Sequence, residues 1–472
     1  MDDQPSVPRP TIFILYGATG DLAHRLVLPA FYGLAIAGLL PQEWRLVGNG
    51  RGDVSDEDFQ ERVRESLEEF GPKPSEGPWE EVRSRFRFAG GGFDRNDPGR
   101  LLDVVHEAQR EIGGRPQLVH YMAVPPAAFG PLTEAIGSHG LSAHSRVVYE
   151  KPFGTSAETF AELDRVSHET FEESQIYRID HFLGKEALQD IHVLRFANGL
   201  FAGAWNHTHI KSVQVDVPEI LDVAMRASFY EATGAILDML VTHLFQVAAE
   251  VAMEPPHCLE PECLAEVREG VIGCFRPLTR SDVVVGQYEG YRDIEGIPDD
   301  SRTETFVAAK LWVDNGRWKG VPFLLRTGKC MAESHQRVSV QFKDPQRGLP
   351  GQPLGCSVLT FELSGDGDIQ LSAVVKEPGA TMSLGTATVT IPLGTGFPMP
   401  PLPAYGRLLL DVLVGDRSLF TRPDGLVHVW QVAAAISDDK PEPIIYEKGS
   451  WGPAEAVELA KPDFWQLQGR GE

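Results

Sequence analysis

The chain has 472 residues and carries 43 Lys and Arg against 67 Asp and Glu, which gives a net charge of −24. Hydrophobic residues make up 42% of it, enough to bury a core, so disorder over the whole chain is excluded. The acidic balance disfavours binding to nucleic acid or to anionic membranes, because their phosphates would be repelled. Any anionic ligand must therefore be held by a local group of basic residues.

The cysteines and the N-terminal segment bear on the compartment and on metal binding. Five cysteines at irregular spacing are too few for a disulfide framework. The stretch from Pro255 to Cys263 holds His257, Cys258 and Cys263, but no second ligand pair follows at zinc-finger spacing, so we expect no metal site. Residues 1–10 lack the basic and apolar regions of a signal peptide, and we find no apolar run of the ~20 residues that a membrane helix needs. We therefore expect a soluble cytoplasmic protein.

The first third of the chain alternates strands with helices. The continuous apolar run Thr11–Tyr16 is typical of a buried parallel strand. Further strands are expected over Arg45–Gly48, Gln117–Val124 and Arg146–Glu150, and helices over Asp21–Leu40, Ser55–Phe70 and Asp97–Ile112, the last with Asp97 as N-cap and Pro98 at the first helical position. This alternation predicts a Rossmann-like, doubly wound parallel sheet.

After about residue 175 the pattern changes to an α+β order. Strands are expected over Gln175–Asp180 and Lys211–Glu219, and helices over Lys185–Asn198 and Phe229–Met253. From residue 303 onward β-rich runs separated by Gly, Pro and Asp predict antiparallel pairing: Thr303–Val313, Val321–Arg326, Arg337–Phe342, Ser357–Leu363 and Thr381–Ile391. We expect a nucleotide-binding domain over residues 1–177 and a larger α+β domain, with a mainly antiparallel sheet, over residues 178–472.

A glycine-rich turn joins the first strand to the first helix. It reads GATGDLA over residues 17–23, the G-x-x-G-x-x-A variant of the dinucleotide loop. Small residues let the backbone approach a pyrophosphate, and the helix N-terminus supplies amide donors. The residues expected to bind the cofactor are Gly17, Thr19, Gly20, Asp21 and Leu22.

The end of the second strand bears on the choice between NAD and NADP. Arg51 lies where a 2′-phosphate would be recognised, so NADP is the expected cofactor. Asp53 follows two positions later, and a carboxylate there would suit the free ribose hydroxyl of NAD. NAD use therefore stays possible.

Two further motifs carry polar chemistry. Lys151 follows a strand and precedes Pro152, at the sheet edge where ligands bind. The stretch RIDHFLGKE over residues 178–186 holds an acid, an imidazole and basic residues around a glycine turn. His181 and Lys185 could bind a phosphate there. A charged surface loop without a ligand would have the same sequence pattern, so that alternative stays open. Asp180 and His181 can share a site only if the chain leaves the strand at that point.

Further candidates lie on the next strand and the long helix. Glu219 ends a strand, and Asp238 and His243 lie within the predicted helix. A lone histidine in an apolar stretch is more often a core residue than a catalyst, so His243 by itself carries little weight.

These pieces, in this order, resemble the glucose-6-phosphate dehydrogenase family from about residue 11 to residue 453. The matching motifs are GATGDLA at 17–23, EKPFG at 150–154, RIDHFLGKE at 178–186, LRFAN at 194–198, THLFQV at 242–247, VPFLLRTGK ending at 329, LLLDVLVGD at 408–416 and SWGP at 450–453. RIDH-x-LGK is highly specific to that family.

The resemblance implies NADP-linked oxidation of the C1 hydroxyl of glucose 6-phosphate to 6-phosphogluconolactone, the entry to the pentose phosphate pathway. It implies that His243 is the general base and Asp180 the carboxylate that orients it. His181 and Lys185 match phosphate ligands; Lys151, Glu219, Asp238 and Lys329 match residues around the sugar, and Lys151 also lies by the cofactor. The family's large antiparallel sheet commonly forms a dimer interface, so a homodimer or homotetramer is expected.

Several departures from the family pattern concern the substrate pocket. Phe182 stands where a Tyr is usual, Ser334 where a second basic residue is usual, and Thr242 where an Asn is usual. The segment after Glu219 reads ILDVAMRAS where the family normally carries glycines. Two alternatives therefore stay open: the same reaction on another hexose or hexose phosphate, and a dinucleotide-binding sensor without turnover.

Overall fold

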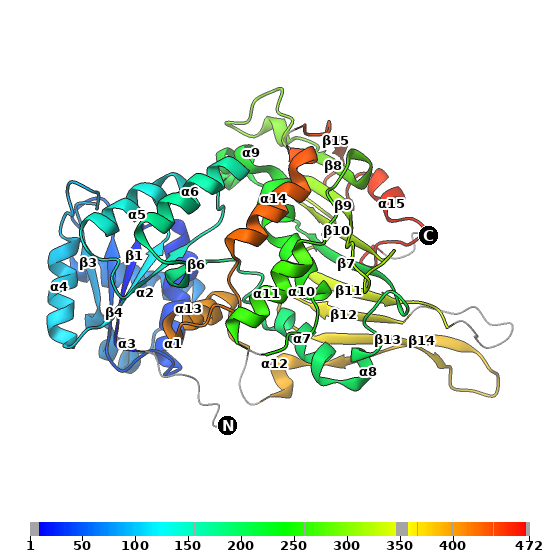
Figure 1. Ribbon diagram of the computed structural model, residues 1–472, viewed down its shortest axis with the longest axis horizontal. Coiled ribbons are helices and arrows are strands. Elements are labelled where there is room, and N and C mark those ends of the chain that lie inside the picture. The colour runs from blue at the N-terminus through cyan, green and yellow to red at the C-terminus, as the bar shows by residue number, and fades with distance from the viewer. Residues whose placement is uncertain are drawn as a thin grey trace. The chain divides into compact units, whose positions relative to one another are not determined.

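A computed structural model describes residues 9–154, 156–258, 260–345, 357–365, 367–397, 401–437 and 439–468. The chain divides into two compact units that are not contiguous in sequence (Figure 1). The first unit runs to residue 184 and also includes residues 260–265 and 403–423; the second comprises the remainder. We keep the boundary between residues 177 and 178 as a proposal for where the nucleotide-binding part of the chain ends.

The first unit is built on a six-stranded, all-parallel sheet. Its strand order is β3-β2-β1-β4-β5-β6. The strands are β1 (Thr11–Tyr16), β2 (Trp44–Asn49), β3 (Phe86–Ala89), β4 (Gln117–Met122), β5 (Ser145–Tyr149) and β6 (Ile176–Arg178). The predicted Rossmann-like class is confirmed, and the predicted strands match within a few residues. The short strand β3 was not predicted.

Helices connect these strands in the crossovers that cover both faces of such a sheet. They are η1 (Ala23–Val27), α1 (Leu28–Ile36), α2 (Asp56–Phe70), α3 (Glu76–Val82), η2 (Arg83–Arg85), α4 (Leu101–Ile112), η3 (Pro126–Ala128), α5 (Phe129–Ser138), α6 (Ala157–Thr170) and η4 (Glu173–Gln175); α13 (Ala404–Val414) joins them from the C-terminal part. Helix α2 begins as expected, because the Ser55 hydroxyl accepts the Asp58 N–H at 3.0 Å.

The predicted start of α4 was wrong. The Asp97 carboxylate accepts the N–H of Gly99, only two residues on, at 2.9 Å, and Gly99 has a positive φ of 53°. This local turn uses the side chain that we expected to cap the helix, so α4 begins at Leu101 with Arg100 at its N-cap.

The second unit is built on a nine-stranded mixed sheet of order β14-β13-β12-β11-β7-β10-β9-β8-β15. Its strands are β7 (Ile210–Pro218), β8 (Val283–Tyr288), β9 (Phe306–Trp312), β10 (Pro322–Gly328), β11 (Arg337–Phe342), β12 (Val358–Glu362), β13 (Ile369–Lys376), β14 (Leu384–Ile391) and β15 (Ile444–Tyr446). The pairs β7/β10 and β8/β15 are parallel and the other pairs are antiparallel, so the α+β prediction is confirmed.

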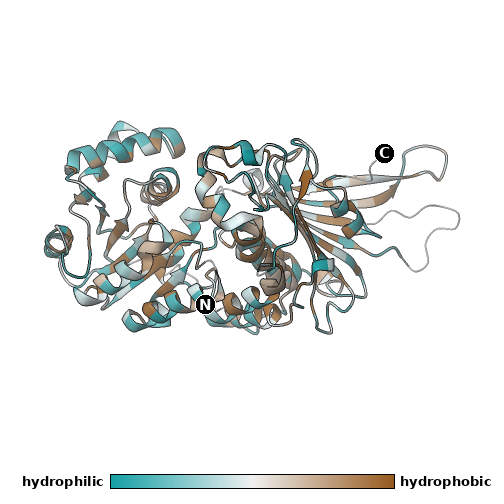
Figure 2. Cartoon of the chain, turned by 90° about the horizontal axis from the view of Figure 1, so that it is seen from above, coloured by the Kyte–Doolittle hydropathy of each residue, from teal (hydrophilic) through white to brown (hydrophobic). Residues whose placement is uncertain are grey.

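Its helices are α7 (Glu186–Ala197), α8 (Gly199–Ala202), η5 (Ala224–Arg226), α9 (Ala227–Ala235), η6 (Ile236–Leu244), α10 (Phe245–Ala252), η7 (Arg280–Asp282), η8 (Tyr291–Asp293), α12 (Leu393–Gly396) and α15 (Glu455–Ala460); α11 (Pro261–Ile272) and α14 (Pro423–Ser437) also lie in this half of the chain. In Figure 2 the brown, hydrophobic colouring concentrates on strands and inner helices, and teal residues line the outer helices.

One helical stretch, kinked at Gly234, is long and apolar enough to cross a membrane by length and composition. It spans 29 residues, Ala224–Ala252, whereas the sequence analysis found no run of that kind. The structure buries 83% of its most apolar window inside the protein, as the core helix of a globular unit does. We therefore treat this stretch as a core helix.

Candidate functional site

The glycine loop occupies the carboxyl end of β1. Gly17 has a φ of 74°, and a Cβ placed there would lie 2.3 Å from the Ala123 carbonyl oxygen, so only glycine fits. The N–H of Gly20 donates back to the Gly17 carbonyl at 2.9 Å, which closes the turn before the chain enters the helix η1–α1. This bare turn at a helix N-terminus suits a pyrophosphate, so the residues present fit a dinucleotide.

A pocket of about 650 Å³ adjoins this loop. Thr19, Gly20 and Asp21 line it together with residues of α2. Its charged lining is mostly acidic: Asp21, Asp53, Asp58, Glu61 and Glu65 against Arg62. Such a lining repels a phosphate, so recognition of a 2′-phosphate would depend on a cation outside it.

Arg51 is the cation in question. It is exposed and follows Gly50, where an added Cβ would lie 3.7 Å from the Thr19 hydroxyl. The end of β2 therefore approaches the glycine loop, as the cofactor argument requires. Asp53 forms an exposed ion pair with Arg100 at 3.7 Å, which offsets part of its charge.

Lys151 lies at the carboxyl end of β5, at the same sheet edge as the loop. The preceding Glu150 is buried and accepts a hydrogen bond from the Tyr121 hydroxyl at 2.5 Å. Burial raises the pKa of Glu150, and the hydroxyl of Tyr405 on α13 also hydrogen-bonds to it and opposes the rise. Tyr405 was not predicted as a site residue, because no local pattern relates it to β5.

The chain leaves the strand directly before Asp180, as the sequence analysis required. Strand β6 ends at Arg178, and residues 181–184 form a turn. Asp180 is 2% exposed, and its Oδ1 accepts the Phe182 N–H at 2.9 Å. The His181 ring stacks on Tyr405, with centroids 6.2 Å apart and an interplanar angle of 17°. These side chains lie at the sheet edge that carries the glycine loop.

In the second unit the structure brings Glu219 and Lys329 together. Each follows the end of one of the parallel neighbours β7 and β10, where Pro218 and Gly328 are in register. The Lys329 Nζ lies 2.6 Å from a Glu219 oxygen, in a mostly buried ion pair. It also lies 5.8 Å from the centre of the Tyr230 ring. Tyr230 is a second neighbour that the sequence analysis missed.

Ser334, at the position of the missing basic residue, has a structural contact. Its hydroxyl accepts the N–H of Ile220, the residue after Glu219, at 2.9 Å. Lys185, at the start of the second unit, donates from Nζ to the Leu363 carbonyl at 2.8 Å.

His243 and Asp238 lie on the π-helical segment η6. In an α-helix, residues five apart are separated by about 1.4 turns and face apart, whereas the i→i+5 pattern of a π-helix aligns them. The segment therefore turns the half-buried Asp238 and the fully buried His243 towards one side of the helix. The Thr242 hydroxyl is satisfied by the Asp238 carbonyl at 2.6 Å, so it serves the backbone.

The helix that carries His243 is anchored at its C-terminal end. Arg195, from the LRFAN motif on α7, donates to the carbonyls of Val251 and Met253 at 3.0 and 2.7 Å. Glu250 on α10 is buried and ion-paired with Arg268 and, at 2.5 Å, with His192. Despite its burial, these cations lower the pKa of Glu250 to about 2, so it stays ionised. Arg195 of the LRFAN motif therefore holds the C-terminal end of the helix that carries His243.

Both halves of the chain match known protein families. Residues 14–190 match the glucose-6-phosphate dehydrogenase NAD-binding domain, and residues 192–466 match the C-terminal domain of the same enzyme. The glucose-6-phosphate 1-dehydrogenase of Aggregatibacter actinomycetemcomitans is 34% identical over 470 residues, 94% of each chain. Isoform 5 of Arabidopsis thaliana, named cytoplasmic, is also 34% identical, over 95% of this chain and 90% of its own.

Solved structures agree with this match. The glucose-6-phosphate 1-dehydrogenase of Mycobacterium avium superposes with a TM-score of 0.87 at 31% identity, over 98% of this chain and 99% of its own. A glucose-6-phosphate dehydrogenase in complex with glucose 6-phosphate superposes with a TM-score of 0.90 at 29% identity, over 97% and 98% of the two chains. Because the match spans both domains at more than 30% identity to its relatives, this chain belongs to the glucose-6-phosphate dehydrogenase family.

Proposed function

We propose that this chain oxidises the C1 hydroxyl of glucose 6-phosphate to the lactone with a nicotinamide dinucleotide as the hydride acceptor. The observation that carries the proposal is the match to relatives of this activity over 94% of the chain. The chain also carries His243, Asp180 and several lysines in the motifs on which its resemblance to the family rests. In relatives such as these the bound dinucleotide accepts the hydride, and the residues of the glycine loop would hold it here.

We assign the proton transfer to His243. A secondary alcohol releases hydride readily only as its proton leaves, and an imidazole has a suitable pKa near neutrality. A carboxylate partner fixes the tautomer and stabilises the imidazolium, and we assign this role to Asp180. Lys151, Glu219, Asp238 and Lys329 are proposed to hold the sugar; the phosphate is assigned to His181 and Lys185.

We propose NADP as the preferred cofactor, with Arg51 as its determinant. The acidic pocket beside the loop would favour the uncharged ribose of NAD, so Arg51 has to outweigh it. The ratio of kcat/KM for NADP to that for NAD measures the balance. A ratio below one would reverse the proposed preference.

We further propose a cytoplasmic homodimer or homotetramer in which copies meet at the second unit's sheet. Its outer strands expose apolar side chains, among them Val375, Val389 and Ile391 at 42%, 65% and 46% exposure. Analytical ultracentrifugation tests the assembly. A monomer at all concentrations would exclude it.

The function is tested by incubating the protein with NADP or NAD and a panel of hexoses and hexose phosphates, and following reduced nicotinamide. Turnover that is fastest with glucose 6-phosphate is expected. Faster turnover of another sugar would favour the alternative substrate class that Phe182 and Ser334 suggest. Cofactor binding with no turnover of any sugar would support the sensor alternative.

A further inference from the structure

A second large pocket lies at the opposite edge of the parallel sheet from the glycine loop. It has a volume of about 640 Å³, and residues at or just before the amino ends of several strands line it. Arg9 precedes β1, Arg115 and Gln117 lie at the start of β4, and Arg146 lies at the start of β5. The pocket is therefore separate from the residues to which we assign cofactor and substrate.

The lining of this pocket is basic, in a chain whose net charge is −24. It contains three arginines and His144 against a single carboxylate, that of Glu172. Within the part of the chain that the structure describes, Arg9 and Arg115 form no ion pair. The Glu172 carboxylate also caps the short helix η4, and its single negative charge offsets only part of the charge of the three arginines.

One of the arginines that line the pocket, Arg146, is partly buried. Burial lowers the pKa of the Arg146 guanidinium, and the nearby charge of Arg9 lowers it further. His144 lies in the turn before β5, where it adopts a left-handed φ of 56°. Serine hydroxyls of residues 142 and 174 complete the lining. Forked guanidinium donors with hydroxyls nearby are the groups that bind a phosphate.

Helix α13 connects this pocket to the other edge of the sheet. At its C-terminal end, Arg146 donates to the carbonyls of Val412 and Leu413, the latter at 2.9 Å. Gly415 closes the helix in the left-handed conformation, where an added Cβ would lie 2.5 Å from an Arg146 nitrogen. Arg146 is therefore in close contact with the helix end, and a ligand that attracts its guanidinium would compete with these carbonyls.

At its N-terminal end, α13 carries Tyr405. This side chain hydrogen-bonds to Glu150, the neighbour of Lys151, and stacks on His181. The 11 residues of α13 span about 16 Å, so the helix links Arg146 at one edge of the sheet with His181 and Glu150 at the other. A shift of this helix would therefore move the ring that stacks on His181 and the hydrogen bond to Glu150, the neighbour of Lys151.

We propose that this pocket is an effector site for a phosphate-bearing small molecule, coupled through α13 to the substrate-binding residues at the opposite edge of the sheet. The coupling rests on the proposed function, but binding does not. Inorganic phosphate and 3-phosphoglycerate are suitable probes, because they share the phosphate group and differ in size and in an added carboxylate.

Binding is tested by isothermal titration of the full-length protein and of the variants below with each probe, so that any binding at the catalytic phosphate site is common to all of them. We expect a site for at least one probe that depends on the arginines of this pocket. The double variant Arg9→Ala/Arg115→Ala should weaken it tenfold or more, since a hydrogen bond to a charged group corresponds to roughly 10–150-fold in affinity. Arg110→Ala, which removes an exposed arginine on α4 outside the pocket, should leave it unchanged.

The coupling is tested by measuring KM for glucose 6-phosphate with and without the probe that binds. We expect a change within the range of 5–150-fold that is typical of allosteric coupling, absent in the double variant, whose basal kinetics should match those of the wild type. Binding of neither probe, or equal binding by the double variant, would overturn the site. Binding that leaves KM unchanged would overturn the coupling. Absence of turnover would count against the proposed function and leave the titration as a valid test of the pocket.

Discussion

Replacing Phe182 by Tyr restores the hydroxyl that the family usually places beside the phosphate. If glucose 6-phosphate is the substrate, we expect Phe182→Tyr to lower its KM by roughly 10–150-fold, because a hydrogen bond to a charged group contributes about 1.5–3 kcal/mol. The value of kcat should change little, since the phosphate is remote from C1 and contributes equally to ground and transition states.

The structure adds a cost in the free protein. Phe182 is 1% exposed, and its ring centroid lies 4.9 Å from that of His181, so an added hydroxyl would be buried. A buried hydroxyl without a partner costs about 1–3 kcal/mol. We therefore expect the free energy of unfolding to fall by that amount without substrate, and to recover when glucose 6-phosphate binds.

Steady-state kinetics with glucose 6-phosphate and with glucose, together with urea unfolding, measure both effects. Phe160→Tyr on α6 is the matched control, because Phe160 is 2% exposed and we assign it no part in the site. The control should lose stability and keep its KM. An unchanged or raised KM in a well-folded Phe182→Tyr enzyme would refute the reasoning, and a native preference for unphosphorylated glucose would exclude the substrate assignment.

Three further predictions follow from the same residues and from the sheet. His243→Asn should lower kcat by at least 10²–10⁴-fold while NADP binding, followed by fluorescence titration, stays intact; retention of most activity would remove His243 from the mechanism. Arg51→Ala should weaken NADP far more than NAD, and equal losses in their dissociation constants would make Arg51 a simple loop charge. Burial lowers the pKa of His120 from 6.5 to about 4, so the unfolded chain binds more protons between these values. The free energy of unfolding should therefore fall by up to about 3 kcal/mol as the pH drops from 6.5 to 4, and urea unfolding of wild type and His120→Gln should show a weaker dependence in the variant.

The elements that were predictable from sequence are those whose side-chain pattern reflects burial. Strand β1 is buried at every position, and the uninterrupted apolar run Thr11–Tyr16 predicted both its bounds and its burial. Helix α2 has an amphipathic pattern and a serine cap, so its bounds were also predictable. The start of α4 was not, because Asp97 and Gly99 form a local turn that competes with helix initiation.

The candidate site was predictable wherever its residues follow a strand or a glycine turn. Glu219 and Lys329 are 110 residues apart, and their ion pair follows from the parallel pairing of β7 with β10, which sequence patterns do not reveal. Tyr405 joins the first unit only because residues 403–423 return to it. The alignment of Asp238 with His243 depends on a π-helical segment, which has the same hydrophobic pattern as an α-helix. Cys258 and Cys263 are disulfide-bonded, a pairing that their short spacing did not indicate.

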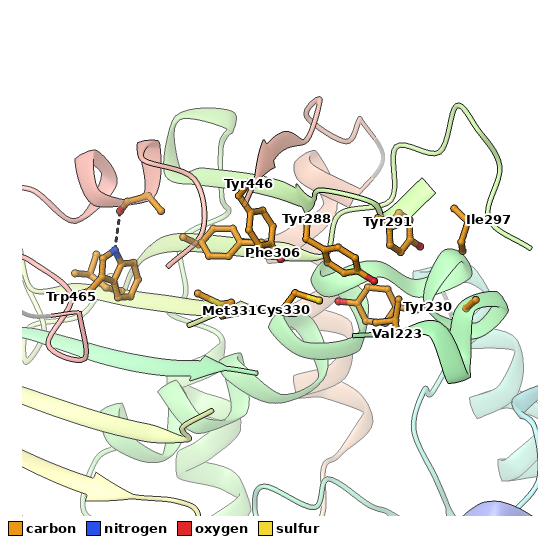
Figure 3. Packing of buried hydrophobic residues seen from close by; sticks show 14 of the residues in the cluster. Val223, Tyr230, Tyr288, Tyr291, Ile297, Phe306, Cys330, Met331, Tyr446 and Trp465 are labelled. Carbon is orange, nitrogen blue, oxygen red and sulfur yellow. Dashed lines mark hydrogen bonds between the residues drawn. The ribbon is translucent and has the colours of Figure 1, made fainter. Parts of the chain in front are cut away.

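The departures from the family pattern differ in whether the structure compensates for them. The segment after Glu219 lacks the usual glycines, but Val223 and Ala227 are buried in an aromatic cluster with Tyr230, which holds the segment by packing (Figure 3). The Ser334 hydroxyl accepts the N–H of Ile220, the first residue of this segment, and Glu219 pairs with Lys329, so the two residues that we propose to bind the sugar stay together.

The side to which we assign the phosphate has no such compensation. Phe182 cannot donate a hydrogen bond from its side chain, and Ser334 carries no charge. Because phosphate contacts contribute to KM and the base acts on kcat, these departures should leave the C1 chemistry intact and weaken discrimination in favour of the phosphorylated sugar. The ratio of kcat/KM for glucose 6-phosphate to that for glucose is therefore the quantity in which this chain should differ most from its relatives.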